Sequence, residues 1–271
     1  MRLRLLLIGV AALAVAVPAA LAAYPAPYAA QGGDGVTSPN GVLHYVAYDA
    51  GKETQLSAIR WSDLVTLKSK KLDGAFGVPM VTSRQQGGMF RDGTKLVLQS
   101  VGSNAETGFR IVDTTDLSVL NSISLKGTFA FDALSPDGRK LYLIQHSSAQ
   151  DLQHYVVRLY DLAENALMPG KIADRAQKGW VMSGWPAART TTVDGRWVYT
   201  LYINPGGFPF VHALDTVKGV AHCVGFRSPS TDQSVILNYT LAAKGAKVLV
   251  RRDNGTLYRV INRNGWKVTT R

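Results

Sequence analysis

The sequence contains a single cysteine, Cys223, among 271 residues, which excludes an intramolecular disulfide and any metal centre built from several cysteines. Acidic residues are few, because 19 Asp and Glu stand against 30 Lys and Arg, for a net charge of +11. No apolar run after residue 24 reaches the length of about 20 residues that a membrane-spanning helix needs. The G-x-S-x-G, H-E-x-x-H, phosphate-loop and EF-hand patterns are also missing, so the enzyme and calcium-binding classes that they mark are not indicated.

The N-terminus has the three parts of an export signal. Arg2 and Arg4 form a positively charged start, residues 5–17 are apolar, and residues 20–22 read Ala-Leu-Ala. A charged start, a short apolar stretch and an A-x-A site are typical of a cleaved signal peptide. We therefore predict a signal peptide at 1–23 and a secreted or extracytoplasmic protein; an uncleaved N-terminal anchor is the alternative.

The predicted mature chain stays basic, with 28 basic and 19 acidic residues, or +9. In an exported protein, this charge favours anionic envelope polymers, acidic lipid surfaces or acidic proteins as partners over nucleic acid. Charge that serves only solubility is the alternative, and no run of five basic residues marks a polybasic tail. Residues 24–40 are rich in proline and glycine, which predicts a flexible lead-in to the domain.

A glycine-marked repeat fills the rest of the chain. Each copy consists of a turn that ends in glycine, a few residues rich in basic or aromatic side chains, and a short apolar strand. The copies are SPNGVLHYV (38–46), FRDGTKLVL (90–98), SPDGRKLYL (135–143), TVDGRWVYT (192–200) and AAKGAKVLV (242–250). Their anchor glycines are Gly41, Gly93, Gly138, Gly195 and Gly245. Repeats at spacings of 45 to 57 residues indicate an array of similar supersecondary units.

A second landmark follows each central glycine. Asp113, Asp161 and Asp215 lie 20 to 23 residues after their anchors, at the end of a strand, where Asp readily opens a tight turn. We therefore predict four antiparallel strands in each unit, the number that forms one blade of a β-propeller. We predict an all-β fold over 41–271, a β-propeller of about five four-stranded blades, with a β-sandwich as the alternative. The first blade lacks an obvious inner strand, so either residues around Val36 supply it or the ring closes imperfectly.

The central units carry a more specific pattern. Residues 109–148 contain a V-D turn at 112–113, a strand, an F-x-x-x-S-P-D-G turn at 131–138 and a strand that begins K-L-Y at 140–142. This segment resembles the YVTN/WD40-like (TolB-like) bacterial β-propeller repeat. The resemblance implies a propeller fold but no single function, because propellers serve as enzymes, scaffolds and receptors alike.

The candidate binding residues lie on loops opposite the Asp-Gly turns. In a four-stranded blade, the connections between second and third strands and between successive blades share one face, and long loops on a rigid scaffold often bind ligands. We assign to that face the loops 82–88, 99–107, 145–154, 176–186, 203–209 and 225–233. The candidate binding residues on them are Arg84, Gln85, His146, His154, Trp180, Trp185, Asn204 and Arg227. As the alternative, Trp180 and Trp185 plug the axis or pack between blades.

Candidate catalytic groups are sparse. His222 adjoins Cys223, but neighbouring residues of a strand point to opposite faces, so the two do not form a catalytic pair and Cys223 is expected to be a small buried hydrophobe. His212 and His222 lack a recognisable third metal ligand, and we predict no metal and no cofactor. Asp132 and Asp151 are the only loop acids of interest.

The sequence therefore favours an exported, non-enzymatic propeller that binds a protein or an anionic envelope polymer through its loop-rich face. The alternative is an extracellular hydrolase of the lactonase type with His146 or His154 as general base, which requires a polarising group in the same pocket. A structural spacer without a ligand is the third hypothesis. We expect no nucleic-acid partner, and membrane attachment only if the signal stays uncleaved.

Overall fold

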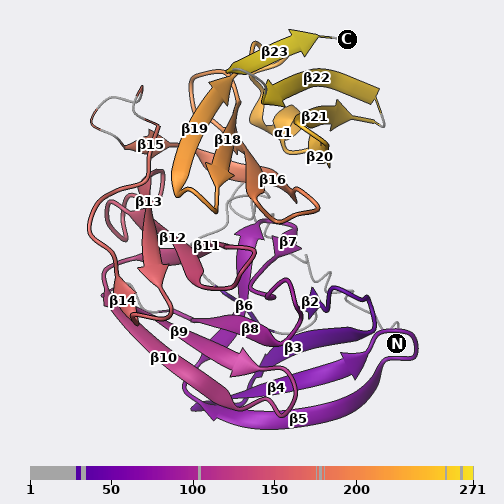
Figure 1. Ribbon diagram of the computed structural model, residues 1–271, viewed down its shortest axis with the longest axis vertical. Coiled ribbons are helices and arrows are strands. Elements are labelled where there is room, and N and C mark those ends of the chain that lie inside the picture. The colour runs from indigo at the N-terminus through magenta and orange to yellow at the C-terminus, as the bar shows by residue number, and fades with distance from the viewer. Residues whose placement is uncertain are drawn as a thin grey trace, which may run out of the picture.

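The structure of the chain, a computed structural model, describes residues 29–31, 35–102, 105–174, 176, 179, 181–253, 255–262 and 265–270. Apart from one short helix, the regular secondary structure of the described chain is antiparallel β-sheet, in five sheets that follow one another in sequence order (Figure 1). We call these sheets blades I to V. No helix within the described ranges has the length and apolar character of a membrane span. The predicted signal peptide at 1–23 lies outside the described residues.

Each blade has four main strands, which follow one another from the inner edge of the sheet outward. Blade I contains β2 (Val36–Thr37), β3 (Leu43–Asp49), β4 (Glu53–Arg60) and β5 (Val65–Asp73). Blade II contains β6 (Phe76–Thr82), β8 (Lys95–Ser100), β9 (Glu106–Asp113) and β10 (Val119–Lys126), with the short strands β1 (Ala29–Ala30) and β7 (Gln85–Gln86) paired to β6. Blade III contains β11 (Phe129–Leu134), β12 (Lys140–His146), β13 (His154–Asp161) and β14 (Ala166–Leu167), with β15 (Met182–Ser183) paired to β13.

The last two blades have four strands each and no additional short strand. Blade IV contains β16 (Trp185–Thr191), β17 (Trp197–Ile203), β18 (Phe210–Asp215) and β19 (Val220–Gly225). Blade V contains β20 (Thr240–Lys244), β21 (Lys247–Arg252), β22 (Gly255–Asn262) and β23 (Trp266–Thr270). A one-turn helix, α1 (Gln233–Ile236), lies between them and is capped by Asp232, whose carboxylate accepts from the backbone N–H of Ser234.

The repeat landmarks adopt the predicted turn conformations. Gly93, Gly138 and Gly195 have φ of +73°, +67° and +76°, a region that residues with a Cβ rarely occupy. At the other turn of blade III, Asp161 Oδ1 accepts a hydrogen bond of 2.9 Å from the backbone N–H of Ala163. The glycine and aspartate pattern therefore marks the two turns on one side of each blade. We call that side of the molecule the turn side and the opposite side the loop side.

Apolar side chains fill the space between successive blades. Leu56 of blade I and Leu98 of blade II are fully buried in one cluster, and Leu201 of blade IV shares another with Val248 of blade V. Two further clusters join blade II to blade III and blade III to blade IV. Four successive sheet-to-sheet interfaces are the packing of a propeller and not of two facing layers, so the propeller prediction is confirmed over the β-sandwich.

The five blades form an arc that strand exchange does not close. Blades I and V lie at its two ends in Figure 1, and no sheet of the described chain combines strands from both ends of the sequence. β2 supplies the inner strand of blade I, as expected around Val36, and β1 pairs with Val78 and Pro79 of β6. Both short strands fall within 24–40, so part of the predicted flexible lead-in belongs to the sheets.

The assignment of loop 82–88 to a connection between blades was wrong. β6 pairs with β8 only at Phe76 and Gly77, and then forms a hairpin with β7 that lies near the centre of the arc (Figure 1). Pro79 has no N–H to continue the ladder, and the chain rejoins β8 where Val97 donates to the carbonyl of Gly88 at 2.8 Å. The loop therefore lies within blade II, between its first and second main strands.

Candidate binding sites around a central ion pair

A buried ion pair joins the inner strands of blades III and IV. Arg189 of β16 donates from Nη1 to Oδ1 of Asp132 of β11 at 2.8 Å, and from Nη2 to the backbone carbonyl of Asp132. The two side chains are only 8% and 4% exposed. The register of β11 shifts between Phe131 and Ala133, so a bulge at Asp132 directs this carboxylate out of the ordinary alternation. The pair fixes the two inner strands relative to each other at the molecular centre.

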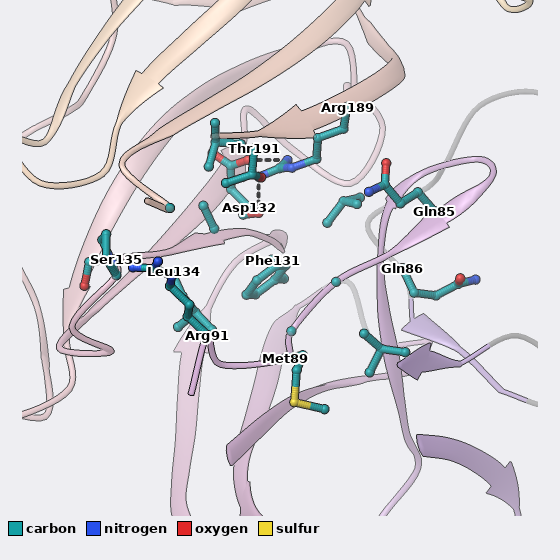
Figure 2. A pocket seen from close by; sticks show the side chains of 18 of the residues that line it. Gln85, Gln86, Met89, Arg91, Phe131, Asp132, Leu134, Ser135, Arg189 and Thr191 are labelled. Carbon is teal, nitrogen blue, oxygen red and sulfur yellow. Dashed lines mark hydrogen bonds and ion pairs between the residues drawn. The ribbon is translucent and has the colours of Figure 1, made fainter. Parts of the chain in front are cut away.

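A pocket of about 320 Å³ opens on the turn side of this ion pair. Gln85, Phe131, Ser135 and Thr191 contribute to its lining, with the paired Asp132 and Arg189 at its inner end (Figure 2). The carboxylate and guanidinium neutralise each other there. The pocket therefore offers hydroxyl and amide groups without a large net charge.

Arg91 at the rim of the turn-side pocket connects two blades that are not adjacent in the arc. Its guanidinium donates to the backbone carbonyls of Val193 and Asp194 in blade IV, at 3.0 and 2.9 Å. Arg91 itself follows the hairpin of blade II, so these hydrogen bonds tie the turns of blades II and IV across the pocket. The Arg91 guanidinium therefore holds two blades together at the mouth of the pocket.

A much smaller cavity, of about 40 Å³, lies on the loop side of the same ion pair. His146, Tyr155 and Trp185 line it together with Asp132 and Arg189. This volume has room for little more than water molecules. The polarising group that the hydrolase hypothesis requires is thus present beside His146, but space for a lactone substrate is not.

His146 is held as a neutral imidazole in that cavity. Its Nδ1 lies 2.8 Å from the backbone carbonyl of Leu152, and because a carbonyl only accepts hydrogen bonds, Nδ1 carries the proton. Burial lowers the pKa of His146 to about 4. The hydrogen bond to Leu152 has the opposite but smaller effect. A histidine with such a low pKa is a weak proton acceptor at neutral pH, far from the value near 7 that suits a general base.

The structure brings together some of the predicted site residues and separates others. His146 and Trp185 share the loop-side cavity, whereas Gln85 lines the turn-side pocket instead, and Arg84 lies beside Gln85 on the central hairpin. The loop-side placement of Arg84 and Gln85 is therefore corrected, since residues 82–88 do not connect two blades. Trp180 lies outside the described residues.

The remaining predicted residues lie toward the periphery of the loop side. His154 is exposed at the start of β13, where its Nδ1 lies 2.9 Å from Oδ2 of Asp151. The exposed Arg227 follows β19, and its backbone carbonyl accepts a hydrogen bond from the hydroxyl of Tyr258. Asn204 lines a separate groove, between blades III and IV. The loop side thus carries two separate hollows among the described residues, and a binding role for it stays a prediction.

The groove beside Asn204 has a volume of about 230 Å³ and an aromatic lining. Met182, Phe208 and Phe210 form its apolar part, and Phe208 is 46% exposed. Within the loop, the N–H of Gly207 donates to the carbonyl of Asn204 at 3.0 Å, while Gly206 has φ of +74°. A proline followed by a glycine of positive φ is the pattern of a type II turn.

This turn orients the side chains at the mouth of the groove. A Cβ at Gly207 would meet the side-chain nitrogen of Asn204 at 2.5 Å, so a larger residue at this position would displace the Asn204 amide at the mouth of the groove. Because Phe208 directly follows this turn, the turn fixes the position of the Phe208 backbone at the mouth of the groove. Phe208 was not among the predicted site residues, although its position directly after Asn-Pro-Gly-Gly marks it in the sequence.

Cys223 faces His212 and not its sequence neighbour His222. The two residues are direct cross-strand partners on β19 and β18, and Sγ lies 3.8 Å from Nδ1. Burial raises the pKa of Cys223 to about 12, with a further contribution from Asp174, and burial lowers the pKa of His212 to about 4. Both groups are therefore neutral at neutral pH, which is the opposite of a thiolate–imidazolium catalytic pair.

No metal centre appears among the residues that the structure describes. No group of three or more His, Cys, Asp or Glu side chains within them has a metal-binding arrangement. His212 Nε2 and Asp132 Oδ2 are buried and make no hydrogen bond within the described chain.

Comparison with solved structures supports the fold. Hydrazine synthase from Kuenenia stuttgartiensis aligns with a TM-score of 0.52 and 13% identity, over 91% of this chain and 66% of that one. The β-propeller domain of Cps50 (Swd1) from Myceliophteria thermophila aligns with a TM-score of 0.50 and 10% identity, over 86% and 69%. TolB from Acinetobacter baumannii aligns with a TM-score of 0.47 and 12% identity, over 86% and 52%.

The likenesses to hydrazine synthase and to Cps50 show the fold and not an activity. The chain spans between about half and about two thirds of the length of the three structures. No protein-family model matches the sequence, and no curated protein matches it. The chain is a β-propeller, the architecture that the glycine repeat predicted; its assignment to the YVTN repeat family stays a prediction.

Proposed function

We propose that this chain is a non-enzymatic, exported β-propeller that binds a protein partner through the loop-side groove of Met182, Asn204, Phe208 and Phe210. The observation that carries the proposal is the aromatic groove itself, with a half-exposed phenylalanine placed at its mouth by a tight turn. Protein interfaces have such an apolar, aromatic centre surrounded by polar groups.

The composition of the groove favours a protein over a charged polymer at this site. Its lining combines the apolar side chains of Met182 and two phenylalanines with the thiol of Cys223, the amide of Asn204 and the hydroxyl of Ser183. None of its described lining residues is a lysine or arginine. A polymer of phosphates or carboxylates needs cations, whereas an apolar side chain of a partner fits between Met182 and the two phenylalanines. The groove therefore suits an aromatic or aliphatic anchor residue.

The protonation states of the buried groups support a binding role over catalysis. The candidate nucleophile Cys223 has a raised pKa, and the candidate bases His146 and His212 have lowered ones. Each group is therefore neutral at neutral pH, without the charge matching that a nucleophile and its base require. A substrate-sized cavity is also missing beside His146 among the described residues.

A pair of matched variants tests the groove. We expect Phe208→Ala to weaken capture of the partner by about tenfold or more, since a truncated aromatic anchor typically removes that much affinity. Val193→Ala is the control, because Val193 is 97% exposed on the turn side, away from the groove. The measurement is quantitative recovery of envelope proteins of the host on immobilised full-length chain, with cross-linking from position 208.

Two results would reject the groove as the binding site. One is equal capture by the wild type and Phe208→Ala; the other is a complete lack of captured protein. A cross-link from position 208 to a protein that Val193→Ala still captures would support the site. The export part of the proposal has its own test, because N-terminal sequencing of the chain from its host should start after residue 23.

A further inference from the structure

The positive charge of this chain is concentrated in blade V. Residues 240–271 contain eight basic residues and a single acidic one, Asp253, whereas residues 5–239 contain 20 basic and 18 acidic residues. Most of the charge excess outside the first four residues, +7 of +9, therefore comes from the last blade. This concentration was not visible in the overall charge, and no property of the propeller fold requires it.

The strand register places these cations on one face of the sheet. Val248, Val250 and Val260 point toward blade IV, where they are fully buried in the shared core. Because side chains alternate along a strand, Lys247 and Arg259 point away from blade IV. That outward face is formed by all four strands and carries Lys244, Lys247, Arg251, Arg259 and Lys267; we call it the basic face.

Three of these cations form a row across the sheet. Lys244 is the direct partner of Lys247, and Lys247 and Lys267 are both partners of position 261 on the strand between them. With neighbouring strands about 4.8 Å apart, the row is about 14 Å long. All three lysines are exposed. Like charges placed directly opposite each other are unfavourable in a sheet, so this row lowers stability unless an anion neutralises it.

The described chain supplies no such anion. None of the five cations of the basic face forms an ion pair within the described residues, and Asp253 pairs with Arg252 at 3.4 Å. Nε of Arg251 is buried without a hydrogen bond. Blade IV packs against the opposite face of this sheet, through Val248, Val250 and Val260.

We propose that the basic face binds a linear anionic polymer of the cell envelope, one that carries repeated phosphate or carboxylate groups. The lysines of this row are separated by one and by two strand spacings, about 5 and 10 Å, so the repeated charges of such a chain can follow the row across the sheet. A membrane surface is a poorer fit, because none of the exposed large apolar residues of the described chain belongs to blade V. A compact protein would likewise find no aromatic anchor on this face. The site is distinct from the groove of the proposed function and does not depend on it.

The test compares two triple variants of the full-length chain with equal net charge. Lys244→Gln, Lys247→Gln and Lys267→Gln remove the row, while Lys68→Gln, Lys70→Gln and Lys71→Gln remove three exposed lysines from β5 of blade I. The probes are long-chain inorganic polyphosphate, poly-L-glutamate and vesicles containing anionic phospholipid. Polyphosphate and poly-L-glutamate distinguish a phosphate from a carboxylate polymer.

We expect the blade V triple to weaken polymer binding by about 10–100-fold at physiological salt, and to reduce the log–log slope of affinity against salt by about three. The blade I triple should change affinity less than twofold, and Phe208→Ala should leave it unchanged. Equal losses in both triples would show an effect of net charge alone and overturn the proposal. An unchanged affinity of the blade V triple, or tighter binding of the vesicles than of either polymer, would overturn it as well.

Discussion

Positive charge is buried and paired at the centre of the molecule, but exposed and unpaired in its last blade. At the centre, Arg189 is almost fully buried and is matched by Asp132, because an unpaired charge there would carry a large desolvation cost. On the basic face, Lys244, Lys247 and Lys267 are exposed and unmatched. At the centre each buried charge therefore needs its partner, whereas the last blade carries charge that no partner within the described chain neutralises.

Blade I shows that an end position in the arc does not by itself produce such a face. Residues 36–73 contain five basic and four acidic residues. On its outward face Lys71 pairs with Glu53 at 2.8 Å, and the hydroxyls of Ser57 and Ser69 are hydrogen-bonded at 2.8 Å. One end blade thus neutralises its outward groups internally, and the other does not. This difference favours a ligand for blade V.

The largest expected effect comes from breaking the central pair. Arg189→Met leaves the Asp132 carboxylate buried without a cation, and we expect the free energy of unfolding to fall by about 3–5 kcal/mol. Lys247→Gln, at an exposed and unpaired position, should change it by less than about 0.5 kcal/mol. Urea unfolding of the full-length chain measures both values.

A compensating variant checks the cause of that loss. The double change Asp132→Leu with Arg189→Met removes both charges, and it should recover much of the stability because no ion is left buried alone. If Arg189→Met cost less than about 1 kcal/mol, the contrast between a paired centre and an unpaired last blade would fail.

Acid should lower the free energy of unfolding by a smaller amount than Arg189→Met, and gradually as the pH falls. Burial, and beyond it the neighbouring Arg189, lower the pKa of His212 to about 4 in the folded state, against about 6.5 when unfolded. Between these values the unfolded chain binds a proton that the folded chain does not. The contribution of His212 to the free energy of unfolding is therefore fully present above pH 6.5. It falls by about 2–3 kcal/mol as the pH drops toward 4.

The control for the acid response is His212→Gln, which cannot take up that proton. Its unfolding free energy should fall less between pH 7 and pH 4 than that of the wild type, although His146 still contributes in the same direction. Equal acid sensitivity of the two proteins would show that His212 is not held neutral by burial.

The fold was largely predictable because its turns depend on backbone conformation. Glycine is strongly favoured where φ is positive, so Gly93, Gly138 and Gly195 recur in the sequence although the strands of the repeats differ. The misplaced loop 82–88 has an equally local cause. Pro79 ends the pairing of β6 with β8 and starts a hairpin, an event that the repeat pattern does not contain.

The site was less predictable because it depends on register. Arg189 lies within an ordinary-looking strand, and only the bulge at Asp132 and the packing of two blades bring the two charges together. The pairing of His212 with Cys223 likewise follows from the register of β18 and β19, which the sequence does not state. His146 and Asn204 were found because distinctive loops carry them.

The most direct test of a ligand-binding last blade is hydrogen–deuterium exchange of the full-length chain with and without polyphosphate. We predict slower exchange in peptides from β21 to β23, residues 247–270, and no change in residues 43–73 of blade I. Protection confined to blade I or to the loop-side groove, or spread evenly over all five blades, would contradict a polymer site on the basic face.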